Sequence, residues 1–421
     1  MRIENLRSWR TDSGGTQVEA DVDGEPLWFA SDDAALLASP EAFASALLIP
    51  AATRGEPLVV EACLDRSWLE SVPAIQELAK EWWRLPGTEV LAADAIEAKR
   101  ERPGVIAQCF TGGVDSFHAL IHAKTPPAVL VYAHGYEFRL RDRRRLDAFL
   151  PRFREIAAAY GARPVLITTN LRRHSASRRV SWEASHGGAL AALGHLLSDE
   201  VERIVIPSSF PYHDPKPWGS HWDMDHLWSS RRLAVEHADA TLRRDGKVRA
   251  IVGHRMVLRH LQVCAESNKR GRPGNCSECE KCVRTMIALA MCGRLADCDA
   301  FDRRRPLEKR VDDLPIIKTH LVSIYEELLS RIDDPRLSAA VRRLIAHSRG
   351  RPEWWYWRVR RWRQNADARL SNGQRRVRRR LQTIAKITPA PLRRFLKRAG
   401  LSNGLLRWLD PNMGTGSGPG T

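Results

Sequence analysis

The sequence contains no long uninterrupted apolar stretch. No run approaches the ~18 apolar residues that a membrane-spanning helix needs, and the first ten residues (MRIENLRSWR) lack the apolar core of a secretory signal. We therefore expect neither a leader nor a membrane span. We expect the protein to be cytoplasmic. Hydrophobic residues make up 43% of the 421 positions, which is enough for a buried core in a soluble globular chain of roughly three domains.

Acidic residues are scarce in the C-terminal segment. Residues 351–421 hold 17 of the 67 Lys and Arg but only 3 of the 50 Asp and Glu, so this segment carries most of the formal net charge of +17. Apolar residues recur there every three or four positions between arginines, at Trp355, Val359, Trp362, Ala366 and Leu370 and again at Leu392, Phe395 and Leu396. Basic amphipathic helices of this kind bind nucleic acid or an anionic membrane surface. As a third interpretation, the apolar stripe of residues 351–400 packs against the rest of the protein. We expect residues 412–421 to be disordered.

Four of the eight cysteines are clustered. Eleven, two and two residues separate Cys264, Cys276, Cys279 and Cys282. Such clustering indicates a metal in a reducing compartment rather than disulfides. Cys-x-x-Cys steps let thiolates converge on one ion, and a fourth thiolate closes a tetrahedron. We predict a structural zinc site, with a [4Fe–4S] cluster as the alternative. We expect Cys109, Cys292 and Cys298 to be spare or buried thiols without a role in the site.

A tight turn joins a predicted strand at 105–110 to a predicted helix at 116–123. The turn reads TGGVDS, with two adjacent glycines that permit unusual φ angles and close backbone approach. Its amides, the hydroxyls of Thr111 and Ser116 and the helix N-terminus would form a concave site suited to phosphate. Asp115 suits such a site if Mg²⁺ bridges its carboxylate to the phosphates.

This turn resembles the pyrophosphatase loop, SGGxDS, of the N-type ATP pyrophosphatase (adenine nucleotide α-hydrolase-like) superfamily, with Thr111 in place of the usual Ser. It is not a Walker A loop, because no Gly-Lys-Ser/Thr follows. The resemblance implies that ATP binds with its β/γ pyrophosphate on Thr111, Gly112, Gly113, Val114, Asp115 and Ser116. It also implies that a substrate carbonyl or carboxylate attacks the α-phosphate and becomes adenylated.

A strand-helix rhythm follows this turn and predicts an α/β fold with a doubly wound parallel sheet. Further strands are expected at 128–133, 164–168 and 203–207, and helices at 141–160 and 182–198. Ligands of such sheets bind beyond the carboxyl ends of the strands. The candidates at those ends are His134, Gly135, Tyr136, Asn170, Ser208 and Ser209. The resemblance places adenine near the second strand, which favours His134 and Gly135.

Two further features are candidates on the substrate side. Residues 211–230 (PYHDPKPWGSHWDMDHLWSS) show no periodicity and are too aromatic for disorder, so we interpret them as a substrate lid. Within it His221, Asp223 and Asp225 are possible metal or acid/base groups. Lys247 precedes an apolar helical stretch and is a candidate catalytic cation for a phosphate.

The cysteine spacing and Arg284 resemble 7-cyano-7-deazaguanine synthase, a member of the same superfamily, and together the two motifs cover residues 105–289. The implied activity is an ATP-dependent ligase or a thiolase-type transferase. It would activate an unidentified small carboxylate or carbonyl substrate for attack by nitrogen or sulfur. Two alternatives stay open. One is a tRNA-modifying enzyme that uses the basic tail, and the other is a non-catalytic nucleotide-binding or membrane-associated scaffold.

The expected organisation has four parts. Residues 1–104 form a small α/β or α+β domain, 105–300 the loop-bearing domain with the four cysteines, 301–350 a helical extension and 351–421 the basic tail. Within the first part we predict strands at 18–22, 27–29 and 58–62 and helices at 40–48 and 64–83. Within the extension we predict helices at 316–330 and 337–347.

Overall fold

The computed structural model describes residues 1–264, 273–315 and 317–349, and the expected basic tail at 351–421 lies outside these residues. The chain divides into two compact units. One contains Met1–Leu314 and Leu328–Arg342, and the other contains Pro315–Glu327 and the residues from Arg343 onward. The candidate residues of the loop, the strand ends and the cysteine cluster all lie in the first unit.

Five parallel strands form the half of the sheet that carries the loop. Their order in space is β12-β11-β8-β9-β10, so the strand order reverses beside β8. The strands are β8 (Val105–Cys109), β9 (Val129–His134), β10 (Arg163–Thr169), β11 (Val201–Ile206) and β12 (Ala234–His237). Helices α3 (Val114–Ile121), α4 (Arg143–Ala159) and α5 (Trp182–Leu196) occupy the connections predicted from the sequence. The loop at 111–116 thus lies at the switch point of an open α/β sheet, where such folds bind ligands.

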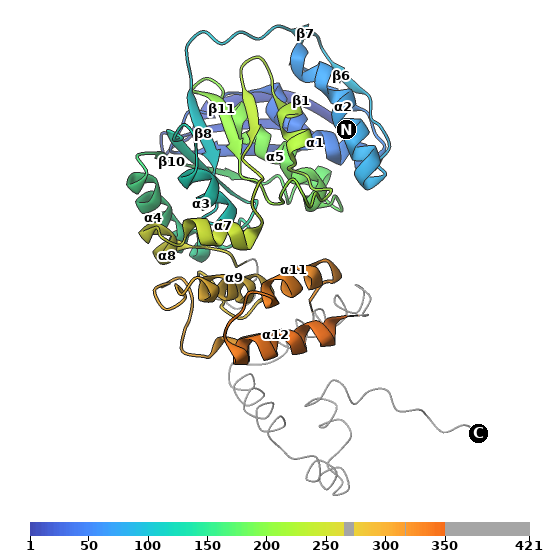
Figure 1. Cartoon of the computed structure of the whole chain (residues 1–421). Coiled ribbons are helices and arrows are strands. Elements are labelled where there is room, and N and C mark those ends of the chain that lie inside the picture. Colours follow the sequence, from blue (N-terminus) through green and yellow to red (C-terminus); the bar gives the residue numbers. More distant parts are fainter. Residues whose placement is uncertain (265–272, 316, 350–421) are drawn as a thin grey trace, which may run out of the picture. The chain divides into compact units, whose positions relative to one another are not determined.

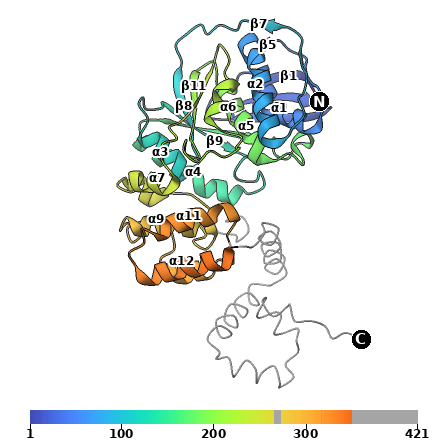
Figure 2. The same cartoon turned by 45° about the vertical axis from the view of Figure 1, so that its right-hand side comes forward.

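Helices cover both faces of this half (Figures 1 and 2). Along β9, Val129 and Val131 join the core that includes α1 (Pro40–Arg54) and α5, whereas Leu130 and Tyr132 join the core that includes α3 and α4. This alternation follows from the two-residue period of a strand. The arrangement is α/β with a large, mostly parallel sheet, and it is consistent with the predicted doubly wound fold.

The N-terminal strands continue the same sheet. Strands β1 (Arg2–Arg10), β2 (Thr16–Val22) and β3 (Glu25–Ser31) form an antiparallel meander, and β3 pairs antiparallel with β10. Next to β1 lie β4 (Leu58–Val60) and β6 (Val90–Ala92), so that the described residues place ten strands in one sheet. The boundary expected at residue 104 therefore falls between strands of one sheet, and residues 1–104 share a core with the parallel half.

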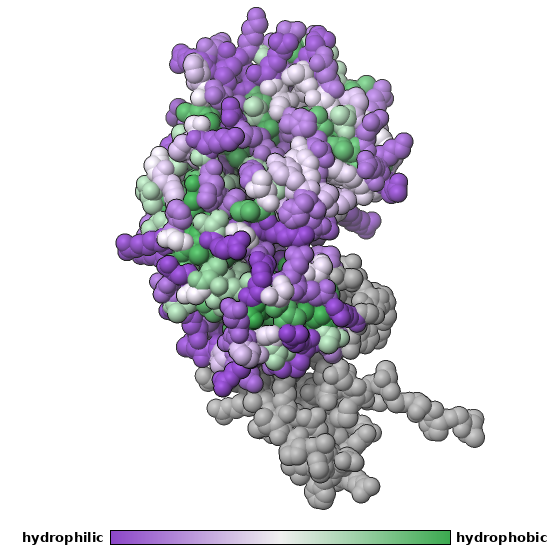
Figure 3. Space-filling model, in the orientation of Figure 1, coloured by the Kyte–Doolittle hydropathy of each residue, from purple (hydrophilic) through white to green (hydrophobic). Residues whose placement is uncertain are grey.

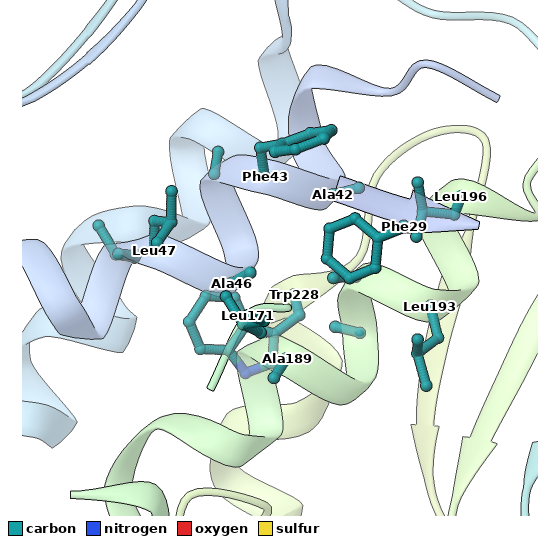
Figure 4. Close-up of a cluster of buried hydrophobic side chains, with 14 of the residues drawn as sticks. Phe29, Ala42, Phe43, Ala46, Leu47, Leu171, Ala189, Leu193, Leu196 and Trp228 are labelled. Carbon is teal, nitrogen blue, oxygen red and sulfur yellow. The ribbon is translucent and has the colours of Figure 1, made fainter. Parts of the chain in front are cut away.

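Figure 4 shows the core that joins the two halves. Phe29 of β3 and Phe43 of α1 meet edge to face, with ring centroids 5.5 Å apart. Ala46 of α1 lies near Ala189 of α5, and Trp228 fills the space beside them. Edge-to-face aromatic pairs add about 0.5–1.5 kcal/mol to the free energy gained by burial. A well-packed core thus fixes α5 against the N-terminal strands.

The remaining elements are short or helical. They are β5 (Leu64–Asp65), α2 (Arg66–Trp83), β7 (Ala95–Ile96), α6 (Trp222–Asp225), α7 (Arg244–Ile251), α8 (Arg255–His260), α9 (Glu280–Met291), α10 (Leu307–Asp312), α11 (Thr319–Leu329) and α12 (Pro335–Ser348). Both helices predicted in the extension are confirmed by α11 and α12. The face in Figure 3 is largely hydrophilic, with apolar residues scattered between polar ones. Within the described residues, no helix is long and apolar enough to span a membrane.

Candidate anion site and metal centre

The loop between β8 and α3 adopts the tight turn that its glycines predict. Gly112 has a φ of +72°, and its carbonyl oxygen accepts a hydrogen bond from the backbone amide of Gln262 at 2.7 Å. Gly113 is the N-cap residue of α3 and provides no side chain to cap it. The first amides of α3 have no intrahelical partners, so they remain available to an anion.

Two hydroxyls stand beside these amides. The backbone amide of Thr111 donates to Oγ of Ser116 at 3.1 Å, and the two side-chain oxygens also lie 3.1 Å apart. Gln108, buried in β8, donates from Nε2 to the carbonyl oxygen of Ser116 at 2.9 Å. These bonds fix the loop against the strand, so its hydroxyls and amides are held in place before any ligand arrives.

Helix α7 brings two cations to the carboxylate of Asp115. Arg244 Nη1 lies 3.0 Å from Asp115 Oδ2, and Lys247 Nζ lies 3.4 Å from Asp115 Oδ1. Lys247 is only 1% exposed, and its ammonium also donates to the carbonyl oxygen and the hydroxyl of Ser208 at 2.6 and 2.9 Å. The structure therefore brings the predicted residues Asp115, Lys247 and Ser208 into one hydrogen-bonded group.

The charges around Asp115 make this group a candidate anion site. Burial by itself would raise the pKa of Asp115, but the charges of Arg244, Lys247 and Lys281 outweigh it and hold the pKa below its ordinary value. Burial, with the charge of Lys247, lowers the pKa of His118 to about 4, so that this histidine is neutral at pH 7. Two buried nitrogens of Arg244, Nε and Nη2, have no hydrogen-bond partner among the described residues. Unpartnered guanidinium nitrogens beside free amides suit the oxygens of a phosphate.

Helix α9 adds two more cations near its N-terminus. The charge of Lys281 helps to lower the pKa of Asp115. Burial, together with the charge of Arg284, lowers the pKa of Arg244. Arg284 Nε itself lies 2.7 Å from Glu280 Oε1, one turn back on the same helix. Arg284, singled out by the sequence, thus lies within electrostatic range of the site. The excess of positive charge predicts affinity for a polyanion.

The four predicted cysteine ligands converge. The Sγ atoms of Cys264, Cys276, Cys279 and Cys282 all lie within 4.8 Å of one another. Two of the separations, Cys264–Cys279 and Cys276–Cys282, are 3.9 Å. A tetrahedron with Zn–S bonds of ~2.3 Å has sulfur atoms about 3.8 Å apart, so the four thiols fit one ion of this size. A cluster of four irons and four sulfides needs wider separations between its ligands.

Backbone and side-chain hydrogen bonds shape the cysteine loop. Cys276 Sγ accepts from the amide of Cys279 at 3.2 Å, a bond that orients a thiolate. Asn275 Oδ1 accepts from the amides of Val263 and Cys264 at 2.8 and 3.1 Å, while its Nδ2 donates to the carbonyl oxygens of Leu261 and Ala300 at 2.7 and 3.0 Å. Asn275 therefore ties the lone cysteine to the segment that holds the other three.

Hydrogen bonds among the four thiols lower the pKa of some of them and raise the pKa of others. Bonds from the neighbouring thiols lower the pKa of Cys264, whereas bonds to Cys264 raise the pKa values of Cys279 and Cys282. Several thiolates cannot carry charge together at this spacing without a cation between them. This electrostatic arrangement supports a metal centre.

The strand-end candidates divide into two groups. His134 ends β9 fully buried, and neither of its ring nitrogens has a hydrogen-bond partner of ordinary geometry among the described residues. Gly135 follows with a φ of +112°, and a Cβ there would clash with the carbonyl oxygen of Thr169. By contrast, Tyr136 Oη donates to the carbonyl oxygen of Ala189 at 2.8 Å, and Asn170 bonds the backbone of Pro26 and Trp28. Those two residues join elements of the fold, while Ser209 is exposed beside Ser208.

The segment 211–230 contains α6 and a short 3₁₀ turn at His226–Trp228, and it packs against two helices. His221 contacts Trp82 of α2 with ring centroids 4.7 Å apart, and Trp218 contacts His186 of α5 at 5.5 Å. Buried Asp225 accepts from Ser220 Oγ at 2.7 Å, His221 N at 3.2 Å and His237 Nδ1 at 2.7 Å. Asp223 lies 3.4 Å from His221 Nδ1. Metal-type clusters in the described residues include none of His221, Asp223 and Asp225.

Sequence reasoning missed three residues of these sites. Arg244 lies one helical turn before Lys247, and this spacing on one helix face is the signal that could have found it. Asn275 directly precedes the second cysteine. Arg310 of α10 is 2% exposed and donates to the carbonyl oxygen of Ser277 at 2.8 Å, which braces the cysteine loop from a distant segment. No local pattern in the sequence marks Arg310.

We compared the chain with models of protein families, with curated proteins and with solved structures, and none of them matches it.

Proposed function

We propose that the chain is an ATP-dependent adenylating enzyme of the N-type ATP pyrophosphatase kind, with similarity to 7-cyano-7-deazaguanine synthase. One observation carries the proposal: at the N-terminus of α3, whose first amides have no intrahelical partners, the carboxylate of Asp115 lies among cations from two other helices. A polyphosphate needs such donors and charges, and a magnesium ion needs the carboxylate.

In this proposal the chain's own groups grip the β- and γ-phosphates. The amides of Gly113, Val114 and Asp115 and the hydroxyls of Thr111 and Ser116 donate to phosphate oxygens. Arg244 and Lys247 supply charge that strengthens as negative charge builds on the departing pyrophosphate. Mg²⁺, when bound with ATP at Asp115, offsets part of the phosphate charge.

An oxygen of the substrate carboxylate or carbonyl would attack the α-phosphorus. The α–β phosphoanhydride bond breaks, pyrophosphate leaves with the bonding electron pair, and an adenylated substrate remains. A nitrogen or sulfur nucleophile then attacks the activated carbon and AMP departs. Buried His134 and Gly135 at the end of β9 are the candidates for the adenine side of the pocket.

The cysteine centre has a structural part in this proposal. Four protein thiolates leave a zinc ion no open position, so the site would stabilise the fold rather than take part in the reaction. Cys279 is the N-cap residue of α9, which carries Lys281 and Arg284 near its N-terminus. A metal at the four cysteines would thereby fix two cations beside the phosphate site.

The test is pyrophosphate release from ATP and Mg²⁺ with pooled small carboxylates and total tRNA. We expect release by the wild-type chain and none by Asp115→Ala, while the exposed control Asp94→Ala keeps the wild-type rate. ATP binding without release from metal-replete protein would instead indicate a nucleotide-binding scaffold. Release that depends on tRNA would favour the tRNA-modifying alternative, whose basic segment lies outside the described residues.

A further inference from the structure

A cavity of about 230 Å³ lies outside the anion site and the metal centre. Its apolar side is formed by Ala46 of α1, Leu171 after β10 and Ala189 of α5, three residues of the core in Figure 4. The indole of Trp182 and the hydroxyl-bearing residues Ser177 and Ser185 line the rest. Pockets for drug-sized ligands occupy ~300–1,000 Å³, so this cavity suits a smaller molecule of one or two rings.

Three arginines line the polar side of the cavity: Arg172, Arg178 and Arg179. The guanidinium of Arg172 stacks on Trp182, with its Cζ 4.5 Å from the ring centroid, and donates to the carbonyl oxygen of Tyr136. Within the described part of the chain, none of the three has a carboxylate within ion-pair distance. An arginine fork and an aromatic face together recognise a ring that carries a carboxylate or phosphate.

Arg179 is held in a backbone conformation that arginine rarely adopts. Its φ is +66°, in the left-handed region that favours glycine. Strained residues of this kind cluster at ligand-binding sites, where the surrounding structure pays their cost. Arg179 is exposed and lines the cavity, and it keeps this conformation although a glycine would adopt it without strain.

The cavity is lined in part by residues that follow the carboxyl end of a parallel strand, as the phosphate loop does. Residues 171–182 come after the carboxyl end of β10, and the loop at 111–116 comes after the carboxyl end of β8. Only β9 separates these two strands, so they run roughly 10 Å apart, and Cys109 at the end of β8 lies level with Val165, four residues before the end of β10. Trp182 contacts Tyr136, which follows β9, with ring centroids 5.1 Å apart.

We propose that this cavity, lined by Arg172, Arg178, Arg179 and Trp182, binds a small ring-bearing organic anion as the co-substrate of the adenylating site. The role as co-substrate rests on the proposed function, whereas the binding itself does not. The arginines hold the anionic group and Trp182 the ring, so a substrate with both is selected over neutral rings and over small inorganic anions.

Ligand-observed NMR on the full chain without ATP or Mg²⁺ tests the binding. The probes are benzoate and phenyl phosphate, with benzyl alcohol as the uncharged ring and inorganic phosphate as the ringless anion. We expect line broadening of benzoate, phenyl phosphate or both, and none of benzyl alcohol. Inorganic phosphate in tenfold excess should not displace the bound probe, because it lacks the ring.

Two variants assign the binding to the cavity. The double change Arg178→Gln and Arg179→Gly should abolish the broadening while the melting temperature stays equal or rises, since glycine relieves the strained φ at 179. Arg10→Gln, an exposed arginine of β1, removes one charge elsewhere and should change neither. Equal broadening with the double variant, or broadening of neither anionic ring, would overturn the proposal. So would displacement of the probe by ATP, which would assign the cavity to the nucleotide.

The outcome is independent of the adenylation assay. Binding of the anionic ring without Asp115-dependent pyrophosphate release would retain the cavity as a ligand site and remove the enzyme proposal. Pyrophosphate release with no anion binding would retain the enzyme and place its substrate elsewhere.

Discussion

The ammonium of Lys247 lies 3.4 Å from the carboxylate of Asp115 and 2.6 Å from the carbonyl oxygen of Ser208. One buried cation thus links the loop after β8 to the end of β11, the two strands between which the order of the sheet reverses. Ser208 in turn donates from its hydroxyl to the carbonyl oxygen of Asp239 at 2.6 Å. The chain therefore holds this cation in place through the ends of two strands rather than on a flexible surface side chain.

Replacing Lys247 with Met tests the role of this cation. The change keeps the length of the side chain but removes the charge that would stabilise departing pyrophosphate. Loss of one such group typically costs about 10²–10³-fold in rate, so we expect a fall of this order in pyrophosphate release. Stability should change by less than about 3 kcal/mol, because the lost hydrogen bonds are offset by removal of a buried charge. The control is Lys99→Met, an exposed lysine outside both candidate sites. A normal rate with Lys247→Met would refute the role.

Arg244→Met separates stability from nucleotide binding. The change breaks the 3.0 Å pair of Arg244 with Asp115 but also removes two buried nitrogens that lack partners in the described structure, so the melting temperature should change little. A charged hydrogen bond to phosphate contributes about 1.5–3 kcal/mol, so the dissociation constant for ATP should rise about 10–100-fold. The neighbouring Arg243, which bonds His213 at 2.9 Å, provides the control Arg243→Met. Unchanged ATP affinity together with a lower melting temperature would show that Arg244 is purely structural.

The metal prediction is about one zinc ion per chain, measured by elemental analysis of protein purified without added metal. Cys276→Ser should lose the ion and lower the melting temperature, because structural zinc contributes directly to folding. Cys292→Ser, outside the cluster, should keep it. ATP affinity should also fall with Cys276→Ser, since α9 begins at the metal site and carries Lys281 and Arg284. Iron with acid-labile sulfide in place of zinc would contradict the geometry of the four Sγ atoms.

The free energy of unfolding should begin to fall already between pH 6.5 and pH 5, before most carboxylates take up protons. Burial lowers the pKa of His118 from 6.5 to about 4, so the unfolded chain binds a proton that the folded chain does not. Stability present above pH 6.5 is therefore lost as pH falls toward 4, by about 3 kcal/mol for this residue. Burial also lowers the pKa values of His134, His186, His195, His221 and His260, which adds to the slope.

Urea unfolding at pH 7.0 and pH 5.0 measures this effect. The difference between the two pH values should be smaller in His118→Gln than in the wild-type protein, because glutamine takes up no proton in either state. Exposed His254→Gln is the control and should keep the wild-type difference. An identical difference in His118→Gln would show that His118 is protonated in the folded chain.

Local patterns predicted the parallel strands, the tight turn after β8 and the thiol cluster. The apolar run at 105–110, the double glycine and the Cys-x-x-Cys steps each depend on neighbours in sequence, and the structure has a strand, a turn and a thiol cluster at these positions. Strand β12, four residues long and partly exposed, has too little pattern to be recognised. Lys247 was singled out as a lone basic residue before a helical stretch, whereas it lies within α7.

Long-range pairing could not be predicted. The antiparallel contact of β3 with β10 joins residues about 140 apart in sequence, and Asn170 reinforces it by bonding Trp28 N at 2.9 Å. The local sequence of β3 and of β10 does not indicate that the two strands pair. The sequence therefore predicts a separate domain for residues 1–104. Arg310 and the Asp225 group are further examples, because their partners come from distant segments.

The most direct test of the account is ATP–pyrophosphate exchange in the presence of the pooled carboxylates, with wild type and Asp115→Asn, alongside ATP affinity. The account predicts exchange by the wild type. It predicts that Asp115→Asn binds ATP at least as tightly, since Arg244 and Lys247 keep their charge, yet shows no exchange. Exchange at the wild-type rate by Asp115→Asn would contradict the central claim that this loop performs the reaction.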